Sequence, residues 1–343
     1  MPRLRVRRDD LASHDLTDDG EGLPLEEGDA RLQVERFALT SNNISYGVAG
    51  DMLGYWKLFP EPGGWGAIPA WGYATVTESQ APGLAEGSRF FGLVPMGSEL
   101  IVRPAVAGPG FVDTSPHRAE LSPIYSTYLG VPADAEDVAL IMRPLFGTAL
   151  LLELVLAEAG FDGADTVVLT SASSKTAYGL AHCLRDHPVR TVGLTSPRRV
   201  EWVRELGLYD DVLSYEQVES LGAPGGAALV DFAGDRPLVR RVHEHLDDQL
   251  KRSTFVGMTH WDAPAEEEPL PGPAQDFFFA PDEMTRRGAT LGDAYGEAWQ
   301  SFAPVVDRAM SITRVTGGEE LTRVFSELLE GRADPATGYV AAL

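Results

Sequence analysis

Cysteine is almost absent from this chain, since Cys183 is the only one among 343 residues. Internal disulfides and thiolate-rich zinc or iron–sulfur sites are therefore excluded. Positive charge is also scarce: 28 lysines and arginines face 51 aspartates and glutamates, which gives a net charge of −23. This excess repels phosphate backbones and anionic lipids, so we expect neither nucleic-acid binding nor attachment to an anionic membrane surface.

Long uninterrupted apolar runs are missing as well. The most apolar stretch, residues 138–161, contains an arginine, a proline and two glutamates, and we interpret it as a buried helix rather than a membrane span. The basic residues 1–10 have no apolar segment after them and do not fit a secretory signal. We expect a soluble, cytoplasmic protein.

The length predicts two domains, and the 44% apolar content is enough for a sizeable core. Short apolar pieces between dense glycines and prolines up to residue 110 predict a small barrel or sandwich. From Pro144, where a helix is predicted to start, helices and strands alternate, which predicts a parallel sheet with crossover helices. Residues 262–273 are acidic and proline-rich and predict a surface loop. The strands that we predict from residue 166 onward span 166–170, 191–194, 211–214, 227–232, 253–258, 276–280, 311–315 and 338–343.

A loop of very small residues follows the apolar strand 166–170 and precedes a helix. A helix N-terminus at such a loop presents N–H groups and a positive dipole end to an anion. A dinucleotide loop normally has glycines where this chain has Ser171, Ser174 and Ala177. A serine-capped turn without a ligand explains the same residues, and a P-loop would need glycines at positions 169 and 174. The candidate phosphate-binding residues are Ser171, Ser173, Ser174, Lys175 and Thr176.

The second strand of this region, which ends at Leu194, is followed by no acidic residue. An NAD site usually has an acid there, whereas an NADP site has arginine and small polar residues. Ser196, Arg198 and Arg199 fit the second pattern, although solvated arginines would look the same. Asp231 ends a later strand, where a carboxylate either reaches the ligand crevice or caps a loop.

Aromatic and amide side chains gather in a glycine-rich segment of the first third, where they form either core or the wall of a pocket. Its members are Asn42, Asn43, Tyr46, Tyr55, Trp56, Trp65 and Trp71. The seven histidines show no spacing typical of metal ligands, and no Gly-x-Ser-x-Gly elbow supports hydrolase chemistry. We therefore predict no bound metal.

Four segments carry a resemblance to a known family. Residues 39–46 are similar to the "GLNxxDY" stretch of zinc-free quinone and enoyl reductases, and residues 144–149 are similar to the interdomain helix of their family. Residues 171–177 occupy the place of its "GxxGxxG"-like loop. Residues 212–215 resemble a strand whose tyrosine, here Tyr215, reaches the NADP 2′-phosphate. Together they resemble the medium-chain dehydrogenase/reductase superfamily over nearly the whole chain. With residues 115–119, the chain resembles a branch catalogued only as a domain of unknown function.

The resemblance implies an α/β fold with a GroES-like β-barrel and a doubly wound Rossmann domain that binds NADP. The barrel, as substrate domain, would comprise residues 1–130 and 309–343, and the Rossmann domain residues 131–308. Zinc-dependent members need a cysteine in the barrel, but Cys183 lies in a Rossmann helix, so zinc chemistry is not expected. Without a metal, a developing oxyanion or carbanion needs donors, for which the candidates are Tyr46, Asn42 and Asn43.

The function predicted from the sequence is an NADPH-dependent, zinc-free oxidoreductase that reduces an activated alkene, quinone or carbonyl of a small molecule. Two alternatives stay open: a non-catalytic NADP-binding protein, for which the serine-substituted loop is the best support, and a non-redox lyase or isomerase. The apolar strand 276–280 lies late in the Rossmann order. If it forms a sheet edge, pairing of two copies would cover it, and a homodimer is expected.

Overall fold

The computed structural model describes residues 2–18, 24–256, 269–288 and 290–343, and the chain divides into two compact units. One comprises Met1–Arg143 and Ser311–Leu343, and the other comprises Pro144–Met310. The chain thus leaves the first unit once and returns to it near its end. The assignment of these units to substrate and NADP stays a prediction.

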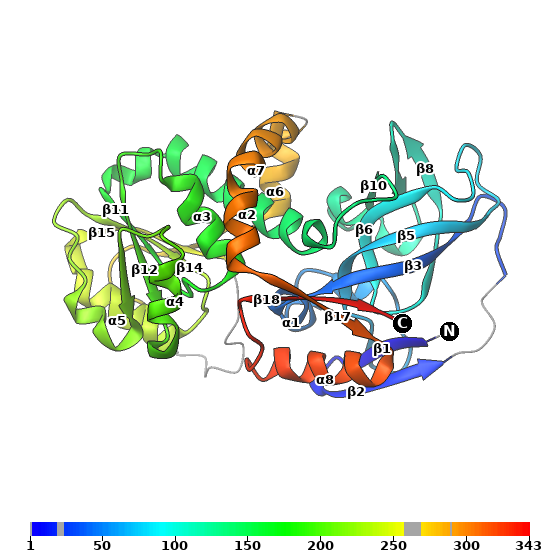
Figure 1. The fold of residues 1–343 in the computed structure, drawn as a ribbon, viewed down its shortest axis with the longest axis horizontal. Coiled ribbons are helices and arrows are strands. Elements are labelled where there is room, and N and C mark those ends of the chain that lie inside the picture. Colours follow the sequence, from blue (N-terminus) through cyan, green and yellow to red (C-terminus); the bar gives the residue numbers. More distant parts are fainter. Residues whose placement is uncertain (1, 19–23, 257–268, 289) are drawn as a thin grey trace. The chain divides into compact units, whose positions relative to one another are not determined.

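The first unit is mainly antiparallel sheet. A larger sheet has the order β17-β18-β3-β5-β6-β10-β9-β8, with β7 also paired to β3, and a smaller one has the order β2-β1-β4. The last strand, β18, pairs antiparallel with β3, so the C-terminal segment completes the larger sheet that residues 30–39 begin (Figure 1). The strands are β1 (Pro2–Arg7), β2 (Asp10–Asp18), β3 (Ala30–Leu39), β4 (Trp65–Gly66), β5 (Pro69–Ser79), β6 (Arg89–Pro95), β7 (Glu99–Val102), β8 (Pro104–Ala107), β9 (Gly110–Asp113), β10 (Thr127–Gly130), β17 (Ser311–Thr316) and β18 (Thr337–Ala342).

Two α-helices and three short 3₁₀ helices complete the first unit. The α-helices are α1 (Ser41–Val48) and α8 (Gly318–Leu329), and the 3₁₀ helices are η1 (Tyr55–Lys57), η2 (Pro116–Arg118) and η3 (Pro123–Ser126). Within the sheet, glycine is required where β6 passes under an aromatic ring. A Cβ on Gly92 would lie 2.5 Å from the ring of Tyr128, which stacks on Phe111.

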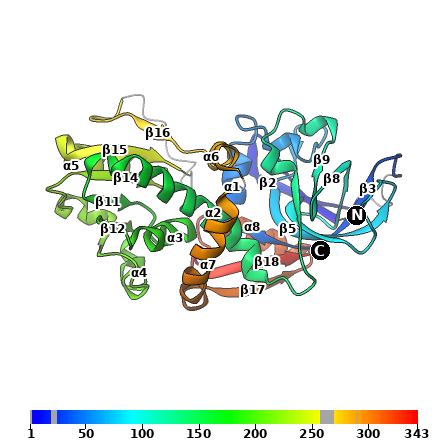
Figure 2. The same cartoon turned by 90° about the horizontal axis from the view of Figure 1, so that it is seen from above.

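The second unit is a six-stranded parallel sheet in the order β13-β12-β11-β14-β15-β16. Figure 2 shows β15, β14, β11 and β12 side by side. The order reverses between β11 and β14, and such a switch point is where ligands bind in doubly wound sheets. The strands are β11 (Thr166–Leu169), β12 (Arg190–Thr195), β13 (Asp211–Ser214), β14 (Ala227–Asp231), β15 (Leu250–Phe255) and β16 (Gln275–Phe277). The helices are α2 (Asp137–Glu158), which begins in the first unit, η4 (Gly160–Gly163), α3 (Lys175–Leu184), η5 (Pro197–Arg199), α4 (Val200–Glu205), η6 (Tyr215–Ser220), α5 (Arg236–Leu246), η7 (Asp247–Gln249), α6 (Ala280–Arg287) and α7 (Thr290–Ala309).

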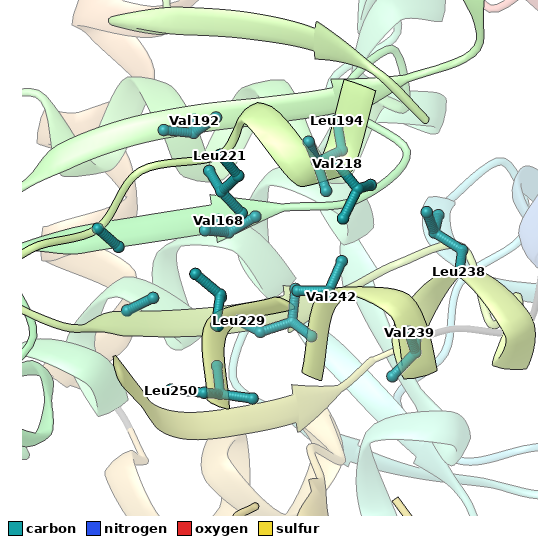
Figure 3. Close-up of a cluster of buried hydrophobic side chains, with 13 residues drawn as sticks. Val168, Val192, Leu194, Val218, Leu221, Leu229, Leu238, Val239, Val242 and Leu250 are labelled. Atoms are coloured by element: carbon teal, nitrogen blue, oxygen red, sulfur yellow. The ribbon is translucent and has the colours of Figure 1, made fainter. Parts of the chain in front are cut away.

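One core of this unit lies between the sheet and α5. Strands β11 and β14 are buried along their whole length, as their continuous apolar sequences indicate. Leu238, Val239 and Val242 of α5 belong to the same buried cluster as Val168 and Leu229 of the strands, and Val242 lies beside Leu229 (Figure 3). This packing fixes the strand ends from which the site loops emerge.

The predicted fold class is confirmed, and the structure corrects three predicted boundaries. Strand β15 begins at Leu250 and ends at Phe255, whereas residues 253–258 were predicted, because the buried Leu250 already belongs to the strand. Helix α2 begins at Asp137, not at Pro144, because the apolar residues before the proline are buried. Strand β16 ends at Phe277, since Pro281 lies in the first turn of α6. Residues 257–258 of one predicted strand and residues 262–268 of the predicted loop lie outside the described residues.

Helix α2 is, among the described residues, the one helix that is long and apolar enough to cross a membrane by length and composition. Leu140, Ile141, Met142 and Phe146 are at most 1% exposed. This burial is that of a core helix in a folded unit.

Candidate functional site

The loop between β11 and α3 adopts a backbone conformation that glycine usually provides. Ser171 has a φ of 49°, in the left-handed region that costs a residue with a side chain roughly 1–2 kcal/mol. Its carbonyl accepts a hydrogen bond from the Ser174 N–H at 2.7 Å. The Ser174 hydroxyl caps α3 by accepting from the Ala177 N–H at 3.3 Å. The loop therefore starts α3 directly at the carboxyl end of β11.

The start of α3 suits an anionic ligand. The N–H groups of a first helical turn have no acceptor within the helix, and they carry the positive end of the helix dipole. Ser173, Lys175 and Thr176 lie here with partly exposed side chains. Their chemistry is compatible with a phosphate group, and the phosphate contact stays a prediction.

Tyr215 lies against this same loop. Its side chain hydrogen-bonds both the hydroxyl and the backbone N–H of Ser171. Burial, the largest influence, raises the pKa of Tyr215 to about 12, and the ring packs against the core below the sheet. The sequence predicted that this tyrosine reaches a cofactor phosphate, but in the structure its hydroxyl is engaged by the protein.

Asp231 ties together the two strands at the switch point. Its Oδ1 accepts from the Thr170 hydroxyl at 2.6 Å and from the Ala233 N–H at 3.0 Å, and both carboxylate oxygens accept from the Gly234 N–H at 3.3 Å. The side chain is buried, and this burial raises the pKa of its carboxyl. Asp231 thus fixes the loops after β11 and β14, as in the loop-capping alternative, and its predicted contact with a cofactor stays a prediction.

The loop after β12 carries the predicted arginines. Strand β12 pairs in parallel with β11, so both loops leave the same edge of the sheet. Ser196 precedes η5 as its cap residue, and Arg198 and Arg199 lie within η5. Arg198 is exposed and forms no ion pair with any described residue. In so acidic a chain, this cation beside the loop at α3 favours an anionic ligand.

The predicted residues of the first unit lie on α1. Asn43 is 2% exposed. Its Oδ1 accepts from the Thr40 N–H at 2.7 Å, and its Nδ2 donates to the Pro69 carbonyl at 2.9 Å. Because both polar atoms of the carboxamide bond backbone groups, the contacts assign Asn43 to anchoring α1 on β5, which differs from the predicted catalytic role.

Tyr46 presents a phenol in a polar and aromatic setting. Its oxygen accepts a hydrogen bond from the Trp71 indole N–H at 3.2 Å and also bonds the Asn42 side chain. Burial raises the pKa of Tyr46, against the lowering effect of these two contacts. The ring packs on that of Tyr55, with centroids 4.6 Å apart. The result is a positioned phenol that stays protonated at neutral pH.

Tyr125 packs with Tyr46 and Tyr55 in one aromatic cluster, and the sequence did not point to it. The hydroxyls of Tyr55 and Tyr125 lie 2.7 Å apart and are buried. The Tyr125 carbonyl accepts from Arg118 Nη1 at 3.1 Å, and Arg118 Nε lies 2.9 Å from Asp113 Oδ2 in an ion pair whose side chains are 2% and 1% exposed. Residues 115–119 were noticed only through the resemblance, and nothing near Tyr125 in the sequence signals its partner 70 residues away.

Metal-ligating side chains do not converge in the described ranges, where no group of three or more histidines, cysteines, aspartates and glutamates is found. Cys183 is a free thiol on α3. Burial raises its pKa to about 12, so the thiol is protonated and unreactive near neutrality.

One protein family matches most of the chain, including the candidate residues of both units. The family described as "Protein of unknown function (DUF2855)" matches residues 37–334. The chain belongs to this family. The sequence resembled a branch catalogued only as a domain of unknown function, and this match confirms that prediction. The comparison with curated proteins finds no match.

Solved structures share the fold of this DUF2855 chain over its whole length. CurA from Vibrio vulnificus, in complex with NADPH, is 14% identical with a TM-score of 0.68, covering 99% of this chain and 98% of that one. The yhdH oxidoreductase from Salmonella enterica, in complex with NADP, is 16% identical with a TM-score of 0.61, covering 100% of both chains. The CurF ER cyclopropanase is 15% identical with a TM-score of 0.60, covering 99% and 98%. The predicted resemblance to medium-chain reductases is thereby confirmed at the level of fold.

Proposed function

We propose that this protein is an NADPH-dependent, zinc-free oxidoreductase that reduces an activated alkene, quinone or carbonyl of a small molecule. The observation that carries the proposal is the left-handed turn from Ser171 to the start of α3, at the switch point of a parallel sheet, with Arg198 on the neighbouring loop. Two solved structures with the same fold support it, CurA in complex with NADPH and the yhdH oxidoreductase in complex with NADP.

The residues of the second unit fit a dinucleotide phosphate. Ser171 adopts the conformation of a glycine, and Ala172 and Ala177 are small and buried, so the backbone at this turn carries little bulk. Ser174 caps α3, and the N–H groups of its first turn would hold the pyrophosphate. Arg198, with Ser196 and Arg199, would hold the 2′-phosphate through charge-assisted hydrogen bonds. When bound, NADPH would supply a hydride to the substrate.

Tyr46 is the proposed proton donor of the first unit. Two donors to its oxygen, Trp71 Nε1 and the Asn42 side chain, orient the phenol and would stabilise negative charge that develops on it as the proton leaves. Asn42 is therefore kept in the proposed site, while Asn43 holds α1 in place.

Replacing Arg198 tests the cofactor preference. A charge-assisted contact contributes about 1.5–3 kcal/mol, so Arg198→Gln should weaken NADPH binding roughly ten-fold or more while NADH binding barely changes. Isothermal calorimetry with both nucleotides measures this. Arg323→Gln, on α8 of the other unit, is the control and should leave both affinities unchanged. Equal affinity of the unmutated protein for NADH and NADPH would contradict NADP preference.

A turnover assay separates this function from the two alternatives. NADPH absorbance is followed with a panel of quinones, enones and aldehydes, beside direct NADPH titration. A reductase oxidises NADPH with at least one class. Binding without turnover identifies a non-catalytic NADP-binding protein, and product without net oxidation of NADPH identifies a lyase or isomerase.

We also propose that the protein is a two-fold homodimer. Strand β16 ends the order of the six-stranded sheet, and its Phe277 is 50% exposed beside Phe279. An open edge strand that carries an exposed aromatic residue is an aggregation hazard unless a second copy pairs with it. Light scattering at micromolar concentration should give twice the chain mass of 37.0 kDa, and Phe277→Lys should shift it toward the single mass. A monomeric unmutated protein would rule the dimer out.

A further inference from the structure

Ser171 and Tyr215 form an unusual pair at the proposed cofactor loop. Ser171 holds a left-handed backbone, φ 49°, directly after the buried Thr170. Tyr215 is the first residue of η6, directly after β13, which lies two strands away from β11 in the sheet order. Its hydroxyl bonds both the N–H and the hydroxyl of Ser171. Ser171 thus combines two features: a backbone conformation that serine disfavours, and a hydrogen-bonding partner from a distant part of the sequence.

A glycine at this position would need no such help, because it lacks the Cβ that opposes positive φ. A serine reverts more readily to an ordinary conformation unless the surroundings hold it. Tyr215 bonds both the N–H and the hydroxyl of Ser171, and these two contacts together restrain rotation about the N–Cα bond that lies between them. The Ser171 carbonyl then receives the Ser174 N–H, which sets the start of α3.

We infer that Tyr215 is a positioning residue that replaces the missing glycine: it holds Ser171 in the left-handed conformation and thereby keeps the phosphate loop in its binding shape. The inference rests on the proposed function for its ligand. It differs from the sequence expectation, in which Tyr215 contacts the 2′-phosphate. A contact to the 2′-phosphate would affect NADPH alone, whereas a loop support affects every dinucleotide that uses the loop.

A double-mutant cycle tests the inference. Tyr215→Phe removes only the hydroxyl, and with it both hydrogen bonds to Ser171. It should weaken NADPH and NADH by the same factor, about three- to ten-fold. Ser171→Gly in that background should restore both affinities to within about two-fold of the original, since glycine adopts positive φ unaided. Loss of NADPH affinity alone, or failure of Ser171→Gly to restore binding, would overturn the inference.

Tyr209→Phe is the matched control. Its hydroxyl donates to the Ala172 carbonyl at 2.8 Å, in the same loop, so its removal also costs one hydrogen bond there. Ser171→Gly should not restore binding to this variant, because the Ala172 bond does not hold the Ser171 conformation. Equal rescue of both tyrosine variants would mean that glycine improves the loop generally, which would refute the specific role of Tyr215.

Hydrogen exchange without any nucleotide separates this inference from the proposed function. The Ser171 amide should exchange several-fold faster in Tyr215→Phe than in the unmutated protein, because its acceptor is gone. A Ser171 amide that exchanges at the rate of an exposed loop in the unmutated protein would refute the contact itself. Absence of NADPH binding to the unmutated protein, with normal Ser171 protection, would instead refute the proposed function and with it the loop's assigned ligand.

Discussion

Tyr46→Phe should lower kcat by roughly 10²–10⁴-fold while NADPH affinity and the free energy of unfolding stay the same. The substitution removes the proposed proton donor and leaves a ring that still packs on Tyr55. The Trp71 N–H loses its acceptor. Trp71 itself is partly exposed, so water can replace the phenol oxygen. Steady-state kinetics with whichever substrate class oxidises NADPH measures the rate, and urea unfolding measures the stability.

The pH profile adds a second readout for Tyr46. Because burial raises its pKa above the ordinary value of about 10, the phenol keeps its proton throughout the neutral range. The Tyr46-dependent part of kcat should therefore be flat from about pH 6 to pH 9 and fall only at higher pH.

Tyr73→Phe is the matched control for Tyr46. Tyr73 lies on β5, the strand that also carries Trp71, and its hydroxyl donates to the Glu136 carbonyl at 3.0 Å. Its removal should cost about 0.5–1.5 kcal/mol of stability and leave kcat largely intact. If Tyr46→Phe behaves in this way too, Tyr46 is a structural residue and has no part in the reaction.

The parallel sheet could be predicted from the sequence because its signals are local. Each strand is a short apolar run followed by small or polar residues, and burial on both faces keeps the run continuous. The position of the phosphate loop follows from the same pattern, since Ser171 and Ser174 lie between such a strand and a helix. The start of α2 was misplaced because a proline at position 144 is read as a helix start, while buried apolar residues before it extend the helix.

Side-chain partners that are distant in sequence could not be predicted. Whether Asn43 faces a substrate or caps α1 depends on the Pro69 carbonyl, 26 residues away. Whether Tyr215 reaches a cofactor or the protein depends on the backbone conformation of Ser171, which a sequence pattern built on glycine does not describe. Composition and spacing identified the residue types at the candidate sites, and only the fold decides which of their polar atoms remain free.

Arg118→Met should lower the free energy of unfolding by about 3–5 kcal/mol, the largest stability effect that we expect in this chain. Arg118 and Asp113 form an ion pair at 2.9 Å in which both side chains are almost fully buried. Removing the guanidinium leaves the Asp113 Oδ2 charge without its cation in a site that excludes water. The Tyr125 carbonyl loses its donor as well. Arg323→Met, at a salt bridge on the surface of α8, should change stability by no more than about 0.5 kcal/mol.

Asp113→Asn in the Arg118→Met background separates the buried charge from the lost packing. Asp113 Oδ1 accepts from the Arg103 N–H and from the N–H and hydroxyl of Ser115, and an asparagine oxygen can keep these bonds without a charge. The double variant should therefore recover a large part of the stability lost in Arg118→Met, as urea unfolding would measure. A loss below about 1 kcal/mol in Arg118→Met, or no recovery in the double variant, would mean that the ion pair does not hold this loop. The same segment carries Tyr125, whose hydroxyl bonds that of Tyr55, and the Tyr55 ring packs on Tyr46. Loss of the Asp113–Arg118 ion pair should therefore also lower kcat in the fraction that remains folded.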